Sequence, residues 1–300
     1  MQDTLDILKK ADELIEKTEF QSAIDILNEA VRKIEENPIL YEVDFPVVYK
    51  KLGQCHGLIG DIEEANKFFR EGLTSSTRNL NEIEKTDILA SLAYLELDTG
   101  NLYDALKYAA KAEDIISEKR GKKLSTARAN TFYVLGDIYF REGDIEKAED
   151  YYKKARVIYR KWKLEEQRTS ATLDIVKIRI MEGNYIESGL YLSEKLLDKI
   201  ESKCPRILYK YYLVLGKLEV ETKQYDSAKE NYEKALNSAK NHYGERYIPE
   251  IYEAMGDLAV IEGDNVKAKN YYNKALDYYQ ERNRTPHIER VEIKVKQTEG

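Results

Sequence analysis

The stretch FYVLGDIYFREGDIEKAEDYYKKA, residues 132–155, sets the pattern for the whole chain. Phe132, Leu135 and Tyr139 recur every three or four residues, which predicts the buried face of a first helix. Gly143 followed by Asp144 predicts a tight turn, because glycine readily adopts the positive φ that ends a helix and aspartate caps the next one.

A second helix is predicted after this turn, with Ala148, Tyr152 and Ala155 on the face that meets the first helix. Gly136 lies inside the first helix, where glycine is about 1 kcal/mol less favourable than alanine. We therefore expect another backbone to pass close to Gly136. The unit as a whole is predicted to be a helical hairpin.

The same pattern recurs along the chain at steps of 40 to 43 residues. The positions equivalent to Gly136 are Ala11, Gly53, Ala93, Gly136, Val176, Gly216 and Gly256. Twelve residues further on, all seven positions hold small residues: Ala23, Ala65, Ala105, Ala148, Ser188, Ala228 and Ala268. Internal similarity at a period of roughly 20 to 50 residues is typical of a solenoid.

This pairing of small residues around a Gly-Asp turn resembles the tetratricopeptide repeat (TPR) family, over about residues 4 to 280. HEAT and armadillo repeats share the period but lack the pairing. The usual TPR period is about 34 residues. The longer repeats here are similar to those of kinesin light chain, LGN-type polarity proteins and the Rap-type and PlcR-type peptide receptors of Gram-positive bacteria. The resemblance implies an all-α TPR solenoid wound as a right-handed superhelix.

We predict one solenoid domain of seven helix-turn-helix repeats over residues 1–283, followed by a C-terminal capping helix and tail over residues 284–300. Ile288, Val291 and Val295 recur at helical spacing and would cover the last hydrophobic face, as solenoids require. The first repeat has no such cap. We therefore expect either that the chain is a fragment of a longer protein or that a partner covers this repeat, with self-association as one possibility.

The fifth repeat fits the pattern least well. Val176, Ser188 and Lys195 replace the small core residues of the other repeats. Three interpretations stay open at this point, namely drift of the repeat, a bend and a functional site.

Composition limits the function. The net charge of -7 argues against nonspecific nucleic-acid binding, which depends on Lys and Arg. Cys55 and Cys204 form no paired motif, which favours packing roles in a reducing compartment. No apolar run approaches the roughly 20 residues of a membrane span, and the N-terminal residues carry charges where a signal peptide is apolar. We expect a cytoplasmic protein that binds neither membranes nor nucleic acid directly.

The 24 tyrosines could suggest stacking on single-stranded nucleic acid. Their positions argue otherwise, because Tyr152, Tyr232 and Tyr272 occupy one and the same core position of the second helix. We interpret them as core residues whose hydroxyls reach the edge of the helix.

Residues for catalysis are not grouped in the sequence. His56, His242 and His287 form no metal-binding pair, and no glycine-rich phosphate loop is present. His56 follows Cys55, so a thiol–imidazole couple is an alternative to a packing role for both. We expect no catalytic residues, no metal site and no cofactor, and hence no enzyme.

The resemblance also implies where a ligand would bind. In TPR proteins the first helix of each repeat lines the concave face, and residues one turn to either side of the small reference position point into the groove. The candidate peptide-binding residues are Gln54, Tyr94, Asn130, Tyr133, Asp137, Lys177, Lys210, Leu213 and Lys217, with Asp257 in the last repeat. Asn130 can donate to and accept from a peptide backbone. Lys177, Lys210 and Lys217 make the groove locally basic, and we expect Lys177 and Lys217 to face solvent.

Two functions are compatible with these observations. The first is a non-enzymatic interaction module whose concave groove holds an extended, acidic peptide or a segment of a partner protein. The second is the peptide-sensing domain of a bacterial transcription factor or phosphatase, similar to quorum-sensing receptors. The chain shows neither a DNA-binding helix-turn-helix nor a helical bundle ahead of the repeats, and additional residues before Met1 would favour the sensor.

Overall fold

The computed structural model describes residues 2–36, 44–78, 81–117, 122–242, 247–282 and 284–299. These residues are almost entirely helical and include no strand, so the predicted all-α fold is confirmed. The chain divides into two compact units, Met1–Ile138 and Tyr139–Gly300. Each unit is described by itself below.

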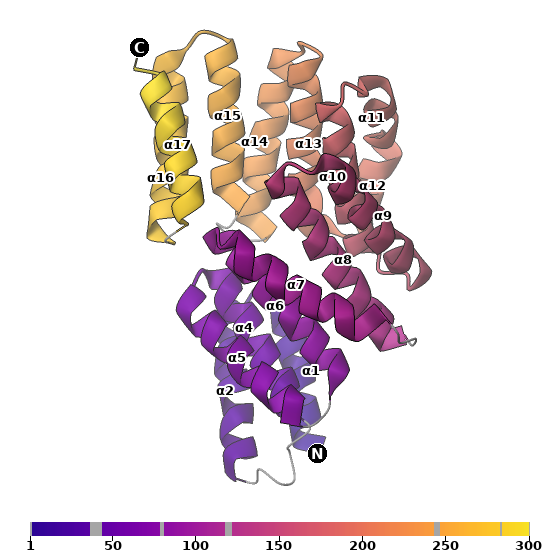
Figure 1. Ribbon diagram of the computed structural model, residues 1–300. Helices are drawn as coiled ribbons and strands as arrows, with labels where there is room; N and C mark the ends of the chain where they lie inside the picture. The colour runs from indigo at the N-terminus through magenta and orange to yellow at the C-terminus, as the bar shows by residue number, and fades with distance from the viewer. Residues whose placement is uncertain are drawn as a thin grey trace. The chain divides into compact units, whose positions relative to one another are not determined.

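The N-terminal unit consists of helical hairpins (Figure 1). Its helices are α1 (Gln2–Glu16), α2 (Phe20–Glu36), α4 (Phe45–Ile59), α5 (Ile62–Arg78), α6 (Glu82–Thr99), α7 (Leu102–Ser117) and most of α8 (Lys122–Glu142). The pairs α1 with α2, α4 with α5 and α6 with α7 each pack together, and consecutive pairs also touch. Helix α8 opens the fourth hairpin and crosses the division between the units.

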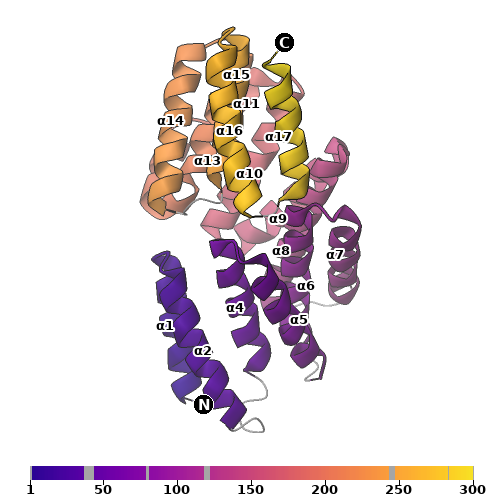
Figure 2. The same ribbon diagram turned by 90° about the vertical axis from the view of Figure 1, so that its left-hand side faces the viewer.

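The C-terminal unit continues the same alternation (Figure 1). Its helices are α9 (Ile145–Lys161), α10 (Glu165–Met181), α11 (Tyr185–Tyr191), α12 (Glu194–Lys203), a short 3-10 turn (Pro205–Ile207), α13 (Leu208–Glu221), α14 (Tyr225–His242), α15 (Ile248–Ile261), α16 (Asn265–Glu281) and α17 (Thr285–Gln297). The first helices of the fifth, sixth and seventh repeats are therefore α10, α13 and α15. Helix α17 lies beside α16, as Figure 2 also shows.

The turns inside the hairpins share one backbone conformation. Gly143, predicted to form such a turn, and its equivalents Gly60, Gly100, Gly183 and Gly263 all have φ between 80° and 92°. At the two hairpins without glycine, Thr18 and Lys223 occupy the same position, each with φ 63°. The fold thus requires a left-handed residue here even where the sequence does not supply the residue that adopts it most easily.

The small residues predicted for the core are buried. Ala23, Ala65, Ala105, Ala148, Ser188, Ala228 and Ala268 are all fully buried. Among the described residues, hydrophobic clusters join neighbouring hairpins: one links α1 and α2 with α4, for example, and another links α13 and α14 with α15. This nearest-neighbour packing is how a solenoid builds a core.

Three glycines that are equivalent to Gly136 lie against aromatic rings, while the prediction for Gly136 itself stays a prediction. At Gly53, Gly216 and Gly256, the neighbour is an aromatic ring of the second helix and not a backbone. A Cβ added to Gly256 would lie 2.4 Å from Cε1 of Tyr272. Glycine at this position makes room for the buried ring that pairs with it.

The fifth repeat contains a bend. Its second helix breaks after Tyr191, and α12 begins at Glu194. The hydroxyl of Tyr211 on α13 donates a 2.9 Å hydrogen bond to the carbonyl of Leu192 at the break. Lys195, which stands where other repeats have a buried alanine or glycine, is exposed. Of the three interpretations of this repeat, the structure supports the bend.

The predicted closing helix is α17. Val291 is fully buried against α16, with Ile288 and Val295 partly buried beside it. These are the three residues whose spacing predicted the helix. They cover the apolar surface of the seventh repeat.

Candidate functional site

The candidate residues predicted from the sequence all lie on first helices, but they belong to different units. The N-terminal unit holds five of them: Gln54 on α4, Tyr94 on α6, and Asn130, Tyr133 and Asp137 on α8. The C-terminal unit holds the other four: Lys177 on α10, and Lys210, Leu213 and Lys217 on α13. Gln54 is exposed, and the other four N-terminal candidates are half-buried. Asp257 on α15 is exposed.

The prediction that Leu213 contacts a peptide is wrong, because its side chain is buried. Its side chain is only 3% exposed and belongs to a hydrophobic cluster with Tyr232 and Ile251. The residue three positions before the small reference residue is also buried in other repeats, as Leu173 and Glu253 show. This position points into the contact between helices, so Leu213 offers no surface to a ligand.

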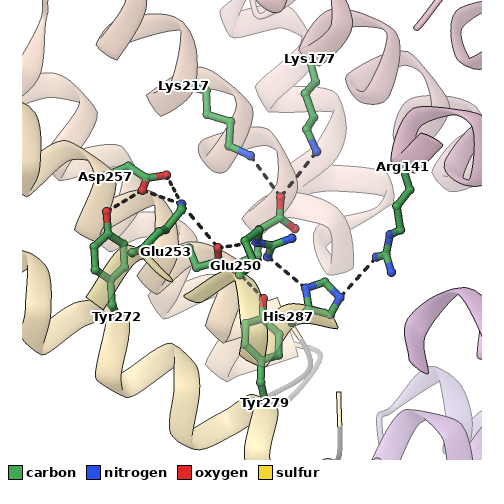
Figure 3. A network of polar contacts seen from close by, with 11 residues as sticks. Arg141, Lys177, Lys217, Glu250, Glu253, Asp257, Tyr272, Tyr279 and His287 are labelled. Carbon is green, nitrogen blue, oxygen red and sulfur yellow. Dashed lines mark hydrogen bonds and ion pairs between the residues drawn. The ribbon is translucent and has the colours of Figure 1, made fainter. Parts of the chain in front are cut away.

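Lys177 and Lys217 converge on one carboxylate from a third helix (Figure 3). Oε1 of Glu250, on the first turn of α15, accepts a 3.1 Å hydrogen bond from Nζ of Lys217 and lies 3.7 Å from Nζ of Lys177. The lysine side chains are 27% and 28% exposed, whereas that of Glu250 is 44% exposed. The prediction that both lysines face solvent is therefore only half right.

Lys210 has different partners. Its Nζ donates to Oγ of Ser170 at 2.8 Å and to Oδ2 of Asp174 at 2.7 Å, both on α10. We call Lys177, Lys210, Lys217, Asp174 and Glu250 the lysine cluster. Three cations meet two carboxylates in it, which leaves a surplus of one positive charge in a protein whose net charge is -7.

The pKa directions agree with this imbalance. Burial alone would raise the pKa of Glu250, but Lys217 and Lys177 lower it well below its usual range. Burial lowers the pKa of Lys177, Lys217 lowers it further, and Glu250 offsets these effects only in part. Glu250 is thus well neutralised, while Lys177 is not.

Lys177 also lacks close acceptors. Among the described residues, Glu250 is the carboxylate that pairs with its ammonium group, and Oε1 of Glu250 lies 3.7 Å from Nζ. This distance is longer than a hydrogen bond. The nearest other partner is the ring of Phe140, whose centroid is 4.6 Å from Nζ. An ammonium group has three donors, so Lys177 has unused capacity.

A second polar network holds the closing helix (Figure 3). Glu253 on α15 is 7% exposed and accepts hydrogen bonds from the hydroxyl of Tyr279 at 2.8 Å and from Arg290 on α17. Lys294 donates to Asp257, which also accepts from Tyr272. His287 lies at the edge of this network, with its ring nitrogens 3.0 Å from Arg290 and 3.3 Å from Arg141. Asp257 therefore helps to attach α17, which is a structural role.

The N-terminal unit has a corresponding cluster of the opposite sign. Lys50 on α4 contacts both Glu84 and Asp87 on α6, and Asn130 on α8 donates to Asp87 at 3.3 Å. One cation here meets two carboxylates. Burial alone would lower the pKa of Lys50, but Asp87 and Glu84 raise it, while burial raises the pKa of Asp87. We call these four residues the acidic cluster.

Glu250 was missed at the sequence level, although the repeat pattern contains the signal. It stands six residues before Gly256, as Lys210 stands six before Gly216 and Asn130 six before Gly136. Asp87 and Ser170 occupy this position in two further repeats. The first two repeats hold Leu5 and Val47 at this position, so its polar character is shared by the third to seventh repeats.

The structure does not support the thiol–imidazole alternative. Cys55 is fully buried, and burial raises the pKa of its thiol to about 12, so the nucleophilic thiolate is not accessible near neutral pH. His56 instead lies 3.1 Å from Asp61 and stacks on Phe68. The side chain of His242 lies outside the described residues.

The described residues include neither a metal-binding group of side chains nor a membrane-spanning helix. No group of three or more His, Cys, Asp or Glu side chains in the described ranges is arranged to hold a metal ion. None of the helices described here is long and apolar enough to cross a bilayer.

Comparison with known proteins adds the family. Two models described as tetratricopeptide repeat match residues 86–161, and residues 209–242 and 249–282. No curated protein sequence matches the chain.

Three solved structures illustrate the likeness. A tetratricopeptide repeat protein from Parabacteroides merdae ATCC 43184 is 19% identical, with 100% of both chains covered and a TM-score of 0.54. A Rap protein complexed with Competence and Sporulation Factor is 14% identical, with 97% of this chain and 80% of that chain covered and a TM-score of 0.72. The Rap conjugation gene regulator of the plasmid pLS20, in complex with the Phr* peptide, is 15% identical, with coverage of 93% and 74% and a TM-score of 0.73. At these identities the likeness establishes the fold alone.

Proposed function

We propose that this chain, which is a tetratricopeptide repeat protein, is a non-enzymatic interaction module that binds an extended, acidic peptide or partner segment. The binding surface is the first-helix face of the C-terminal unit, where α10 and α13 present Lys177 and Lys217. The single observation that carries the proposal is the under-neutralised ammonium group of Lys177.

An uncompensated charge of this kind argues for a ligand. Burying a charge without full pairing costs free energy, so natural proteins retain such groups mostly where they act on something else. The lysine cluster carries a surplus positive charge on a half-buried surface, and a ligand carboxylate would neutralise it. The acidic cluster of the N-terminal unit has no surplus positive charge, because its one cation meets two carboxylates.

The extended form of the ligand follows from the repeat geometry. In the C-terminal unit, the residues six before and one after each small reference position are half-buried or exposed, and they form a row of polar side chains on α10, α13 and α15: Ser170, Lys210 and Glu250, with Lys177, Lys217 and Asp257. A row of this kind suits an extended backbone more than a compact small molecule. One structural neighbour, the Rap conjugation gene regulator, is in complex with the Phr* peptide, which supports the same class of ligand.

A sensor is the second candidate, and the Rap neighbours favour it. In this version, the chain is the peptide-sensing regulatory domain of a bacterial transcription factor or phosphatase. The match covers 80% of the Rap chain complexed with Competence and Sporulation Factor and 74% of the Rap chain complexed with the Phr* peptide. Reading the gene upstream of Met1 for an additional domain distinguishes a sensor from a free-standing module.

Selection from a displayed library of random peptides tests the binding surface. We expect the parent protein to enrich peptides with Asp, Glu or a free C-terminal carboxylate. The double variant Lys177→Gln with Lys217→Gln should lose this enrichment. Neutral replacements are preferable to glutamates, because two further carboxylates beside Glu250 would repel one another.

The matched control is Lys195→Gln with Lys240→Gln. It removes the same charge from two exposed lysines on α12 and α14, outside the cluster. This control should enrich the same peptides as the parent. Equal enrichment by the parent and by the Lys177, Lys217 double variant would contradict the proposed surface.

A further inference from the structure

We propose that Glu250 is an internal occupant of a carboxylate subsite, and that the ligand's carboxylate binds by replacing it between Lys177 and Lys217. This inference rests on the proposed function and concerns how the same surface is regulated. It assigns to Glu250 the role of a built-in competitor that sets the affinity threshold for acidic ligands.

The geometry distinguishes Glu250 from the other carboxylate of the cluster. Asp174 is mostly buried, with 13% of its side chain exposed, and receives a 2.7 Å hydrogen bond from Lys210. Glu250 is 44% exposed and is held through one oxygen, Oε1, by one hydrogen bond and one longer ion pair. Glu250 is therefore the carboxylate that can leave.

Its position on the helix makes the exchange inexpensive. Glu250 is the third residue of α15, so its side chain projects from the first turn of the helix. When another carboxylate takes its place, the same two ammonium groups are neutralised before and after. The positive end of the α15 dipole continues to favour the displaced carboxylate in solvent.

The lysines gain from the exchange. With Glu250 in place, Lys177 remains 3.7 Å from its nearest carboxylate oxygen, beyond hydrogen-bond distance. A ligand carboxylate is not tethered to α15, so its two oxygens can each accept from one lysine. Lys210 takes no part, because Ser170 and Asp174 already occupy it.

Binding of labelled homopeptides tests the inference by fluorescence anisotropy at low salt. The probes are fluorescein-labelled hexaglutamate with an amidated C-terminus, hexaglutamine with a free C-terminal carboxylate, and amidated hexaglutamine as the blank. The first two probes separate a side-chain carboxylate from a terminal one. We expect Glu250→Gln to bind at least one of the two carboxylate probes about threefold to tenfold more tightly than the parent, and the blank no better.

Glu299→Gln is the matched control. It removes the same charge from the C-terminal unit, where Glu299 pairs with Lys269 away from the cluster. Its affinity for the probes should stay within about twofold of the parent. Circular dichroism of both variants checks that the helices are intact.

Three outcomes contradict the inference. They are unchanged or weaker binding by Glu250→Gln, an equal gain in Glu299→Gln, and no binding of either carboxylate probe to Glu250→Gln. If binding still depends on Lys177 and Lys217 while Glu250→Gln has no effect, only the role of Glu250 is wrong. If the Lys177→Gln, Lys217→Gln variant binds like the parent, the proposed function fails as well.

Discussion

The acidic cluster and the lysine cluster are built on the same frame and carry opposite charge. Each joins first helices of consecutive repeats, α4, α6 and α8 in one unit and α10, α13 and α15 in the other. In the acidic cluster, Lys50 is the single cation for two carboxylates, so removing it leaves both carboxylates without an ion-pair partner in the cluster. In the lysine cluster, Lys177 is a surplus cation, so removing it leaves Glu250 still paired with Lys217. The difference separates a residue that supports the fold from one that the fold does not need.

Lys50→Met should therefore strongly destabilise the N-terminal unit. Glu84 and Asp87 would be left mostly buried without a cation, which costs about 3 kcal/mol in such sites. Hydrogen exchange of α4 and α6, followed by mass spectrometry, measures the loss locally. Protection equal to that of the parent would mean that the two carboxylates do not depend on Lys50.

The two units share the same helical frame, so replacing its interior glycines with alanine should lower the stability of both units by equal amounts. Gly53→Ala would bring a Cβ to 2.6 Å from Phe69, and Gly256→Ala would bring one to 2.4 Å from Tyr272. Each should cost about 1 to 3 kcal/mol in urea unfolding, because the buried ring must move. Gly57→Ala is the control, since its added Cβ would meet Ala65 at an ordinary 3.9 Å and should leave stability equal or higher. A loss in one unit only would show that the repeats are not equivalent.

Lowering the pH should change the contributions of Glu250 and Asp87 to folding stability in opposite directions. Lys217 and Lys177 lower the folded-state pKa of Glu250 against the effect of burial, so its stabilisation is complete above the unfolded value of about 4.3 and is lost as the pH falls through the lowered pKa. The stability difference between the parent and Glu250→Gln should therefore shrink between about pH 5 and pH 3. Burial raises the pKa of Asp87, so the difference between the parent and Asp87→Asn should grow over the same range. Parallel trends in urea midpoints would contradict the assignment.

Lys177→Met should change stability least. Burial and Lys217 lower the pKa of Lys177, which means that its charged form is disfavoured in the fold. We expect the variant to lie within about 0.5 kcal/mol of the parent, or above it. Urea unfolding measures this, and a loss comparable to that of Lys50→Met would show that Lys177 is a structural residue.

The sequence predicted the frame well because the frame depends on residue size and backbone conformation, which repeat in every hairpin. Ala148 and Ala228 are fully buried as expected, and the turn glycines have positive φ. The closing helix was predicted for the same reason. Spacing and side-chain volume were sufficient for these features.

The site was predicted less well because it depends on contacts between repeats. The pairing of Lys177 and Lys217 with Glu250 joins residues 73 and 33 positions apart, through side chains with several rotamers. Leu213 was misplaced because one turn along a first helix leads into the helix contact and not to the surface. The bend in the fifth repeat depends on a hydrogen bond from Tyr211 to the backbone of Leu192, which spacing does not reveal.

A double-mutant cycle between ligand and protein is the most direct test of carboxylate recognition at Lys217. A selected peptide and its Glu→Gln counterpart are titrated against the parent and Lys217→Gln, with affinities measured by fluorescence anisotropy at one salt concentration. If the ligand carboxylate binds at Lys217, the two changes should be coupled by about 1.5 kcal/mol or more. Additive changes, with coupling near zero, would contradict recognition of a carboxylate at this lysine.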